Sequence, residues 1–187
     1  NVDNQDSLEF LSGKNIEPKV ETAQETETEA MNRIGERFSV LDEMSRACIN
    51  GDIRAMIVAG PPGVGKSYGV ETQMEKASMF DQLSGNKIRY NIVKGAMTAL
   101  GLYAQLYKYS DSKNVLIFDD CDSVFADDLA LNILKAVCDT SETRTVSWLS
   151  EGKLVDEETG EAIPRQFEFC GSTIFLTNLD LSVMAKS

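Results

Sequence analysis

The chain of 187 residues contains no histidine. This absence excludes imidazole general bases, triads that include histidine and metal sites with histidine ligands from the chain itself. Any proton transfer must therefore fall to carboxylates, lysine, tyrosine or water.

Long apolar runs and paired cysteines are also missing. No apolar run approaches the ~20 residues that a membrane-spanning helix needs, and the N-terminus, NVDNQDSLEF, has neither the basic nor the apolar region of a signal peptide. The cysteines include no CxxC pair, and we interpret all of them as reduced thiols: Cys48, Cys121, Cys138 and Cys170. These features predict a cytoplasmic protein without a membrane partner.

Basic residues are few relative to acidic ones, which gives a net charge of −12. This balance argues against a broad nucleic-acid footprint, although it permits one basic loop. Residues 1–30 hold half of the net charge and include the nearly apolar-free stretch ETAQETETEA. We predict a flexible acidic leader at residues 1–30, either merely solvated or docking a protein partner, ahead of a core at residues 31–187.

A complete G-x-x-x-x-G-K-[ST] motif stands at residues 60–67. Its glycines allow the backbone N–H groups to face a phosphate chain, its lysine reaches the outer phosphates, and its hydroxyl can ligate Mg²⁺. The helix that follows points its positive end at the same anion. The motif therefore predicts a nucleotide-binding loop made of Gly60, Pro61, Pro62, Gly63, Val64, Gly65, Lys66 and Ser67.

Strand-like and helix-like segments alternate along the core. Short apolar runs typical of strands occur at residues 53–59, 88–93, 115–118 and 173–177. Apolar residues recur at helical spacing at residues 34–48, from residue 66 onward, and at 99–106 and 130–137. The alternation predicts an α/β fold with a parallel sheet flanked by helices, in which ligands bind at the carboxyl ends of the strands.

Two adjacent carboxylates end the apolar run at residues 115–118. Buried carboxylates are costly unless they meet a cation, and Mg²⁺ held by Ser67 would supply one. We therefore predict Asp119 as a metal ligand, direct or through water, and Asp120 as the group that orients or deprotonates the attacking water. Asp122 is expected to cap a helix.

With these motifs the chain resembles the AAA+ class of P-loop ATPases over about residues 31–180. GPPGVGKS is similar to the Walker A loop, VLIFDD to the Walker B strand and TIFLTN to the sensor 1 strand. The resemblance implies a P-loop NTPase fold that binds ATP and Mg²⁺ and hydrolyses ATP, fully active only as a ring or partial ring. It also implies that Lys66, Asp120 and Asn178 are catalytic, Asn178 by positioning the nucleophilic water.

The chain departs from the AAA+ pattern in three places. Walker B ends in Asp-Asp rather than the usual Asp-Glu, as in some replication initiators, helicase loaders and viral helicases. Residues 148–154 and 162–169 flank an acidic turn and predict an inserted β-hairpin before sensor 1, which resembles a hairpin of translocating AAA+ clades or is a surface feature of this protein alone. The helical lid and an arginine finger have no counterpart in this sequence, since Arg144 and Arg165 come too early. We therefore expect a C-terminally incomplete core that binds nucleotide better than it hydrolyses it.

Three functions remain open from the sequence. The first is an ATP-driven motor or loader for DNA or RNA of the DNA-replication type, in which Lys94 and Lys153 either contact phosphates or are ordinary solvated lysines. The second is a protein remodeller or unfoldase that uses the loop at residues 94–98, which lacks an aromatic residue. The third is a nucleotide-switched scaffold. A small-molecule kinase is a weaker fourth hypothesis because no acceptor-site signature is present.

Overall fold

The computed structural model describes residues 26–85, 89–149, 151, 153–156 and 159–180. The chain divides into two compact units, residues 1–34 and residues 35–187. The described part of the first unit is residues 26–34, almost all of it the beginning of helix α1. Most of the predicted acidic leader lies outside the described residues, but α1 begins at Glu27, so the last four leader residues are helical.

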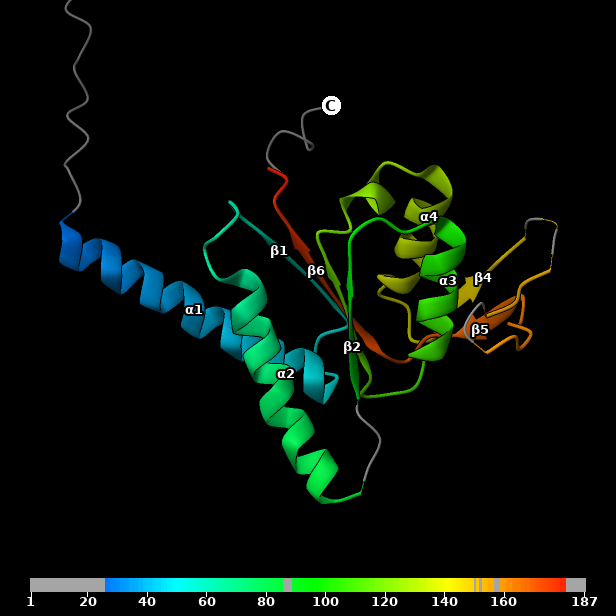
Figure 1. Cartoon of the computed structure of the whole chain (residues 1–187), viewed down its shortest axis with the longest axis horizontal. Coiled ribbons are helices and arrows are strands. Elements are labelled where there is room, and N and C mark those ends of the chain that lie inside the picture. Colours follow the sequence, from blue (N-terminus) through cyan, green and yellow to red (C-terminus); the bar gives the residue numbers. More distant parts are fainter. Residues whose placement is uncertain (1–25, 86–88, 150, 152, 157–158, 181–187) are drawn as a thin grey trace, which may run out of the picture. The chain divides into compact units, whose positions relative to one another are not determined.

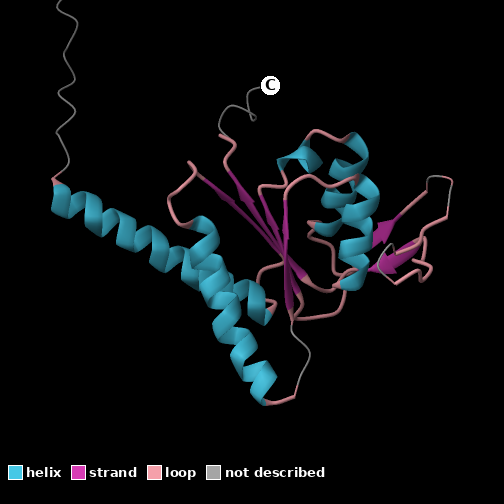
Figure 2. Cartoon of the chain, viewed as in Figure 1, coloured by secondary structure: helices cyan, strands magenta, loops and turns pink. Residues whose placement is uncertain are grey.

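Four parallel strands form the sheet of the second unit, and helices cover both of its faces (Figures 1 and 2). The strands pair in the order β1-β6-β3-β2. This arrangement confirms the predicted α/β class with a parallel sheet between helices. The elements in chain order are α1 (Glu27–Asn50), β1 (Ala55–Ala59), α2 (Lys66–Leu83), β2 (Tyr90–Lys94), α3 (Ala99–Lys108), β3 (Val115–Asp119), the 3-10 helix η1 (Asp122–Phe125), α4 (Asp128–Val137), β4 (Thr145–Ser147), β5 (Gln166–Glu168) and β6 (Ser172–Thr177).

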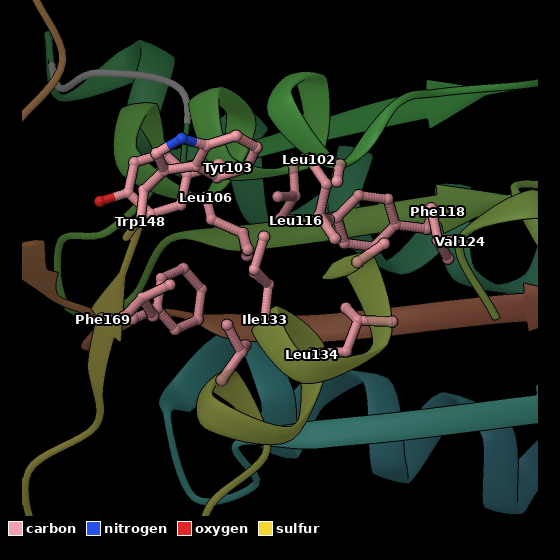
Figure 3. Close-up of a cluster of buried hydrophobic side chains, with 14 of the residues drawn as sticks. Leu102, Tyr103, Leu106, Leu116, Phe118, Val124, Ile133, Leu134, Trp148 and Phe169 are labelled. Carbon is pink, nitrogen blue, oxygen red and sulfur yellow. The ribbon is translucent and has the colours of Figure 1, made fainter. Parts of the chain in front are cut away.

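Strand β3 lies between β2 and β6 in the sheet, and it is buried on both faces because helices cover both sides of the sheet. Its alternate side chains enter different cores, as the period of two in a strand requires. Val115 and Ile117 pack with α1 and α2, whereas Leu116 and Phe118 pack with α3, α4 and η1. Figure 3 shows the second of these cores, in which Phe118 and Leu116 lie beside residues of α3 and α4.

Helix α1 packs closely on the start of α2 within the second unit. A Cβ atom at Gly69 would lie 2.9 Å from Cδ2 of Leu41, and one at Gly65 would lie 3.1 Å from Cζ of Phe38. The two glycines therefore leave room for α1 beside the predicted phosphate loop. Among the described residues, no helix combines the length and apolar character needed to cross a bilayer.

The predicted hairpin is present as β4 and β5, which pair antiparallel in register Thr145 with Glu168. It begins three residues earlier than the pattern indicated, and part of its predicted turn, residues 157 and 158, lies outside the described residues. Its base is anchored to α3, because the Tyr103 hydroxyl donates to the Pro164 carbonyl at 2.9 Å and the Tyr103 ring lies 5.5 Å from that of Trp148. Buried Trp148 makes the hairpin part of the core (Figure 3).

Arg144 anchors the other side of this hairpin. Its side chain donates to the carbonyls of Val137 at 3.0 Å and Gly171 at 2.8 Å, and it lies over the Phe169 ring at 5.1 Å. Only 5% of Arg144 is exposed. Its guanidinium is thus used inside the fold, which agrees with the expectation that Arg144 is not an arginine finger.

The predicted capping role of Asp122 is wrong. Asp122 is the first residue of η1, which lies between β3 and α4 and follows Cys121. Helix α4 is capped instead by Asp127, whose carboxylate accepts from the backbone N–H groups of Leu129 at 2.8 Å and Ala130 at 2.9 Å. The unrecognised 3-10 turn moves the cap five residues along the chain.

Candidate functional site

The predicted phosphate loop, residues 60–67, connects the carboxyl end of β1 to the first turn of α2. Its glycines at positions 63 and 65 have φ angles of 78° and 89°, which favour glycine strongly. Gly65 precedes the first residue of α2, and no side chain caps that end of the helix. The amide groups of the first turn are thus available to an anion, with the positive end of the helix dipole behind them.

The Lys66 ammonium group lies at the centre of this loop. It donates to the carbonyl oxygens of Gly60 at 2.7 Å and Pro61 at 2.9 Å, and to Oδ1 of Asn178 at 2.9 Å. Lys66 thereby connects the loop to the residue that follows β6. This contact exists because β6 is the direct neighbour of β1 in the sheet, with Ala59 beside Thr177.

Asn178 also contacts the end of β3. Its side-chain amide donates to Oδ1 of Asp120 at 2.7 Å, so Asp120, Asn178 and Lys66 form one chain of polar contacts. Asp120 has a φ angle of 54°, unusual for a residue other than glycine, while its backbone N–H donates to the carbonyl of Leu176 at 3.1 Å. The turn at Asp120 leaves this residue exposed, whereas Asp119 before it is buried.

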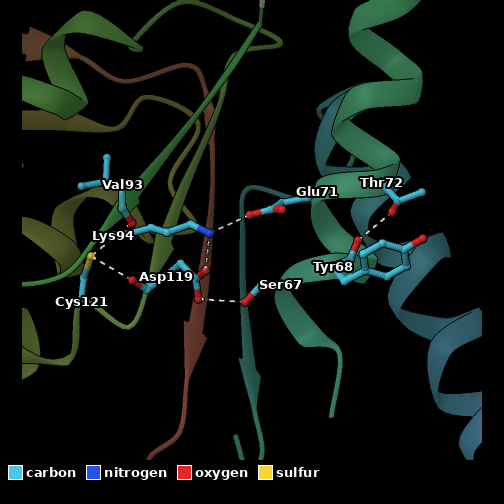
Figure 4. A network of polar contacts seen from close by, with 8 residues as sticks. All are labelled: Ser67, Tyr68, Glu71, Thr72, Val93, Lys94, Asp119 and Cys121. Atoms are coloured by element: carbon cyan, nitrogen blue, oxygen red, sulfur yellow. Dashed lines mark hydrogen bonds and ion pairs between the residues drawn. The ribbon is translucent and has the colours of Figure 1, made fainter. Parts of the chain in front are cut away.

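Asp119 contacts the hydroxyl group of the phosphate loop. The Ser67 hydroxyl donates to Oδ1 of Asp119 at 3.0 Å across 52 positions of sequence (Figure 4). Only 7% of Asp119 is exposed. The structure therefore brings together the two residues that the sequence predicted as metal ligands.

These two residues fit a Mg²⁺ ion held jointly with a nucleotide. The described part of the chain holds no cluster of three or more histidine, cysteine, aspartate or glutamate side chains suited to a metal. Mg²⁺ in nucleotide sites needs no such cluster, because it is bound by one or two protein oxygens, by phosphate oxygens and by water. Ser67 Oγ and the Asp119 carboxylate would supply the protein oxygens.

Two residues of this network were not predicted as part of the site. The Lys94 ammonium lies 3.3 Å from Oδ2 of Asp119 and 2.9 Å from Oε1 of Glu71. Glu71 is four residues after Ser67 and therefore on the same face of α2. Lys94 is the register partner of Asp119 on the adjacent strand, a relation that becomes visible only when β2 and β3 are known to be neighbours.

Cys121 lies next to the site without the properties of a nucleophile. Its thiol contacts the carbonyl of Val93 at 3.3 Å (Figure 4), and only 3% of the residue is exposed. Burial raises the pKa of the Cys121 thiol, and the charges of Asp119, Asp122 and Asp120 raise it further. The thiol is therefore protonated at neutral pH, in agreement with its sequence context.

The chain has a relative in a bacteriophage. It is 37% identical over 163 residues to an uncharacterized 36.7 kDa protein of the nrdC-mobD intergenic region of Enterobacteria phage T4. The match covers 87% of this chain and 47% of the phage protein, so the chain spans about half the length of this curated relative. No protein-family profile matches the chain, and no solved structure matches it.

Proposed function

We propose that the chain is the nucleotide-binding core of an AAA+ ATPase, which couples ATP hydrolysis to the movement or loading of nucleic acid. The observation that carries the proposal is the convergence of three strand ends on one loop. Lys66 and Ser67 of that loop contact Asn178 after β6 and Asp119 at the end of β3. The residues to which the proposal gives roles in triphosphate hydrolysis come from separate segments and meet at one edge of a parallel sheet.

Each residue has a chemical role in this proposal. Lys66 would exchange its carbonyl partners for phosphate oxygens, and the free amides at the start of α2 would bind the same phosphates. Ser67 and Asp119 would hold Mg²⁺, which supplies charge neutralisation at the phosphates. Asp120 would orient or deprotonate the attacking water, and Asn178, already bonded to it, would help to fix the position of that water.

The hydrogen bond between the Asp120 carboxylate and the Asn178 amide would help a short Asp to act where a longer Glu is usual. The Asp120 side chain is held by the Asn178 amide at 2.7 Å, which limits its rotation. An aligned general base contributes about 10² to 10⁴ in rate. A second contact, from the Lys66 ammonium to Oδ1 of Asn178 at 2.9 Å, ties Asn178 to the loop, so that loop, base and positioning residue would respond together to a bound phosphate.

Support for nucleic acid as the macromolecule comes from the hairpin of β4 and β5. Its base is built into the core through Trp148 and Tyr103, which makes it suited to transmit force. Lys153 in the same segment is exposed. The alternative, a protein remodeller, relies on the loop at residues 94–98. Met97 of this loop packs against the core instead of projecting into solvent, which counts against that alternative.

Hydrolysis is tested by measuring phosphate release from ATP with the purified chain, with and without single-stranded DNA. Lys66→Ala is expected to abolish release, and Asp120→Asn to reduce it by about 10² or more. Lys76→Ala is the matched control, because Lys76 is an exposed lysine of the same helix. Release that persists in Lys66→Ala would contradict the ATPase proposal, and release unaffected by DNA, together with no salt-dependent DNA binding, would contradict the nucleic-acid part.

A further inference from the structure

The Lys94 ammonium occupies the space between two carboxylates at the edge of the proposed site. It contacts Oε1 of Glu71 at 2.9 Å and Oδ2 of Asp119 at 3.3 Å, as Figure 4 shows. The two acids come from different elements, α2 and β3, and Lys94 is both the last residue of β2 and the first residue of the loop at residues 94–98. Lys94 is therefore shared between a carboxylate of the site and a carboxylate beside it.

A cation at Asp119 has a physical reason. Asp119 is only 7% exposed, and a buried carboxylate needs positive charge or several hydrogen bonds. The Ser67 hydroxyl bonds one of its oxygens, and Lys94 pairs with the other. A lysine ammonium is charged at neutral pH, so Lys94 supplies the positive charge beside Asp119.

The same carboxylate is the protein ligand that Mg²⁺ would use. Two cations cannot share one carboxylate at short range without strong mutual repulsion. We propose that Lys94 is a built-in competitor of Mg²⁺, which neutralises Asp119 in the nucleotide-free protein and moves to Glu71 alone when Mg²⁺ and nucleotide bind. This inference rests on the proposed function and names a regulatory residue of that site.

The local backbone allows this movement to be passed to a surface loop. Gly95 follows Lys94 with a φ angle of 89°, and its N–H donates to the Asp119 carbonyl at 3.3 Å. Three residues further on, Thr98 caps α3 by accepting from the N–H of Gly101 at 3.1 Å. The loop is thus anchored at α3 and linked to the site at Lys94, so that a shift of Lys94 would move the segment between them.

The test is a Mg²⁺ titration of the purified chain with bound N-methylanthraniloyl-ADP, followed by fluorescence. Lys94→Met removes the competing charge, and we expect the apparent affinity for Mg²⁺ to rise by up to about fivefold, because an ion pair with one largely exposed partner shifts such equilibria by about that amount. Binding of the same nucleotide in EDTA should change less than about twofold, since no Mg²⁺ competes there. Lys94→Arg keeps the charge and should stay near wild type. Lys76→Met, at an exposed lysine of α2, is the control for loss of a lysine.

Glu71→Gln tests the second half of the proposal. Loss of this carboxylate leaves Lys94 with Asp119 as its partner, so Mg²⁺ affinity should fall. In the Lys94→Met background the same change should have a much smaller effect. Equal effects of Glu71→Gln in both backgrounds would overturn the exchange between carboxylates.

The outcomes separate this inference from the proposed function. Weaker nucleotide binding by Lys94→Met in EDTA would overturn the inference and assign Lys94 to the phosphates, leaving the nucleotide site intact. Unchanged Mg²⁺ affinity in Lys94→Met would also overturn it. If the wild-type chain and Lys76→Met are both folded but bind no nucleotide, both the proposed function and the inference fail.

Discussion

Asp119→Asn should separate the proposed role of this residue in Mg²⁺ binding from any role in folding. The substitution keeps the shape of a side chain that is 7% exposed and removes only its charge. In the nucleotide-free protein it weakens the ion pair with Lys94, whose side chain is 59% exposed, and the hydrogen bond from Ser67. The structure thus predicts a small effect on stability and a large one on metal-dependent binding.

The magnitudes follow from the contacts. An ion pair with one largely exposed partner is worth up to about 1 kcal/mol, and a hydrogen bond to a charged group about 1.5 to 3 kcal/mol, of which an amide oxygen retains a part. A total loss of about 2 kcal/mol corresponds to a fall in melting temperature of about 4 to 8 °C for a chain of this size. For Mg²⁺-dependent nucleotide binding we expect a loss of about 10-fold to 100-fold or more.

Thermal unfolding, monitored by circular dichroism, measures the effect on stability. Titration of nucleotide with and without Mg²⁺ measures the effect on binding. Asp52→Asn, at an exposed acid before β1, is the matched control. A fall in melting temperature above about 15 °C would mean that Asp119 is mainly structural. Retained Mg²⁺ dependence of binding would refute the assignment of Asp119 as the metal ligand.

Three further predictions concern the fold that supports the site. Gly171→Ala should destabilise the chain by about 1 to 3 kcal/mol in urea unfolding, because its Cβ would lie 2.7 Å from the Tyr109 carbonyl oxygen. Gly35→Ala, where a Cβ meets nothing within 4 Å, is the matched control and should stabilise α1 by up to about 1 kcal/mol in the same measurement. Tyr103→Phe should lower the free energy of unfolding, measured with denaturant, by about 1 kcal/mol, because the hydrogen bond to the Pro164 carbonyl is lost. An unchanged free energy of unfolding would show that the Tyr103 hydroxyl does not hold the hairpin. Burial raises the pKa of Cys48 to about 11, so its thiol should resist Ellman's reagent at pH 8 until the chain unfolds, and rapid labelling of native Cys48 would contradict its burial. The contribution of this raised pKa to the stability of the fold is present below the ordinary thiol pKa and should be lost as the pH rises toward 11.

The loop and the strand ends could be predicted from local pattern alone. The motif at residues 60–67 has a fixed spacing, and the apolar run before Asp119 gives both the strand and its end. Because the carboxyl ends of parallel strands share one edge of the sheet, the approach of Asn178 to this region could also be expected.

The contacts of Lys94 could not be predicted in the same way. Its pairing with Asp119 depends on β2 lying beside β3 in a particular register, a long-range property that propensity and period do not contain. As an isolated lysine after a strand, Lys94 looked like a solvated or phosphate-binding residue. Asp122 was assigned wrongly for a related reason, since a short 3-10 turn has no periodic signal.

Isothermal titration calorimetry of the purified chain with ATP and Mg²⁺ measures whether the loop at residues 60–67 binds the phosphates of a nucleotide. We expect one site per chain, lost in Lys66→Ala and kept in Lys76→Ala, with both variants folded as judged by circular dichroism. Heat of binding that persists unchanged in Lys66→Ala, or no heat of binding in the folded wild-type chain, would rule out nucleotide binding by this loop.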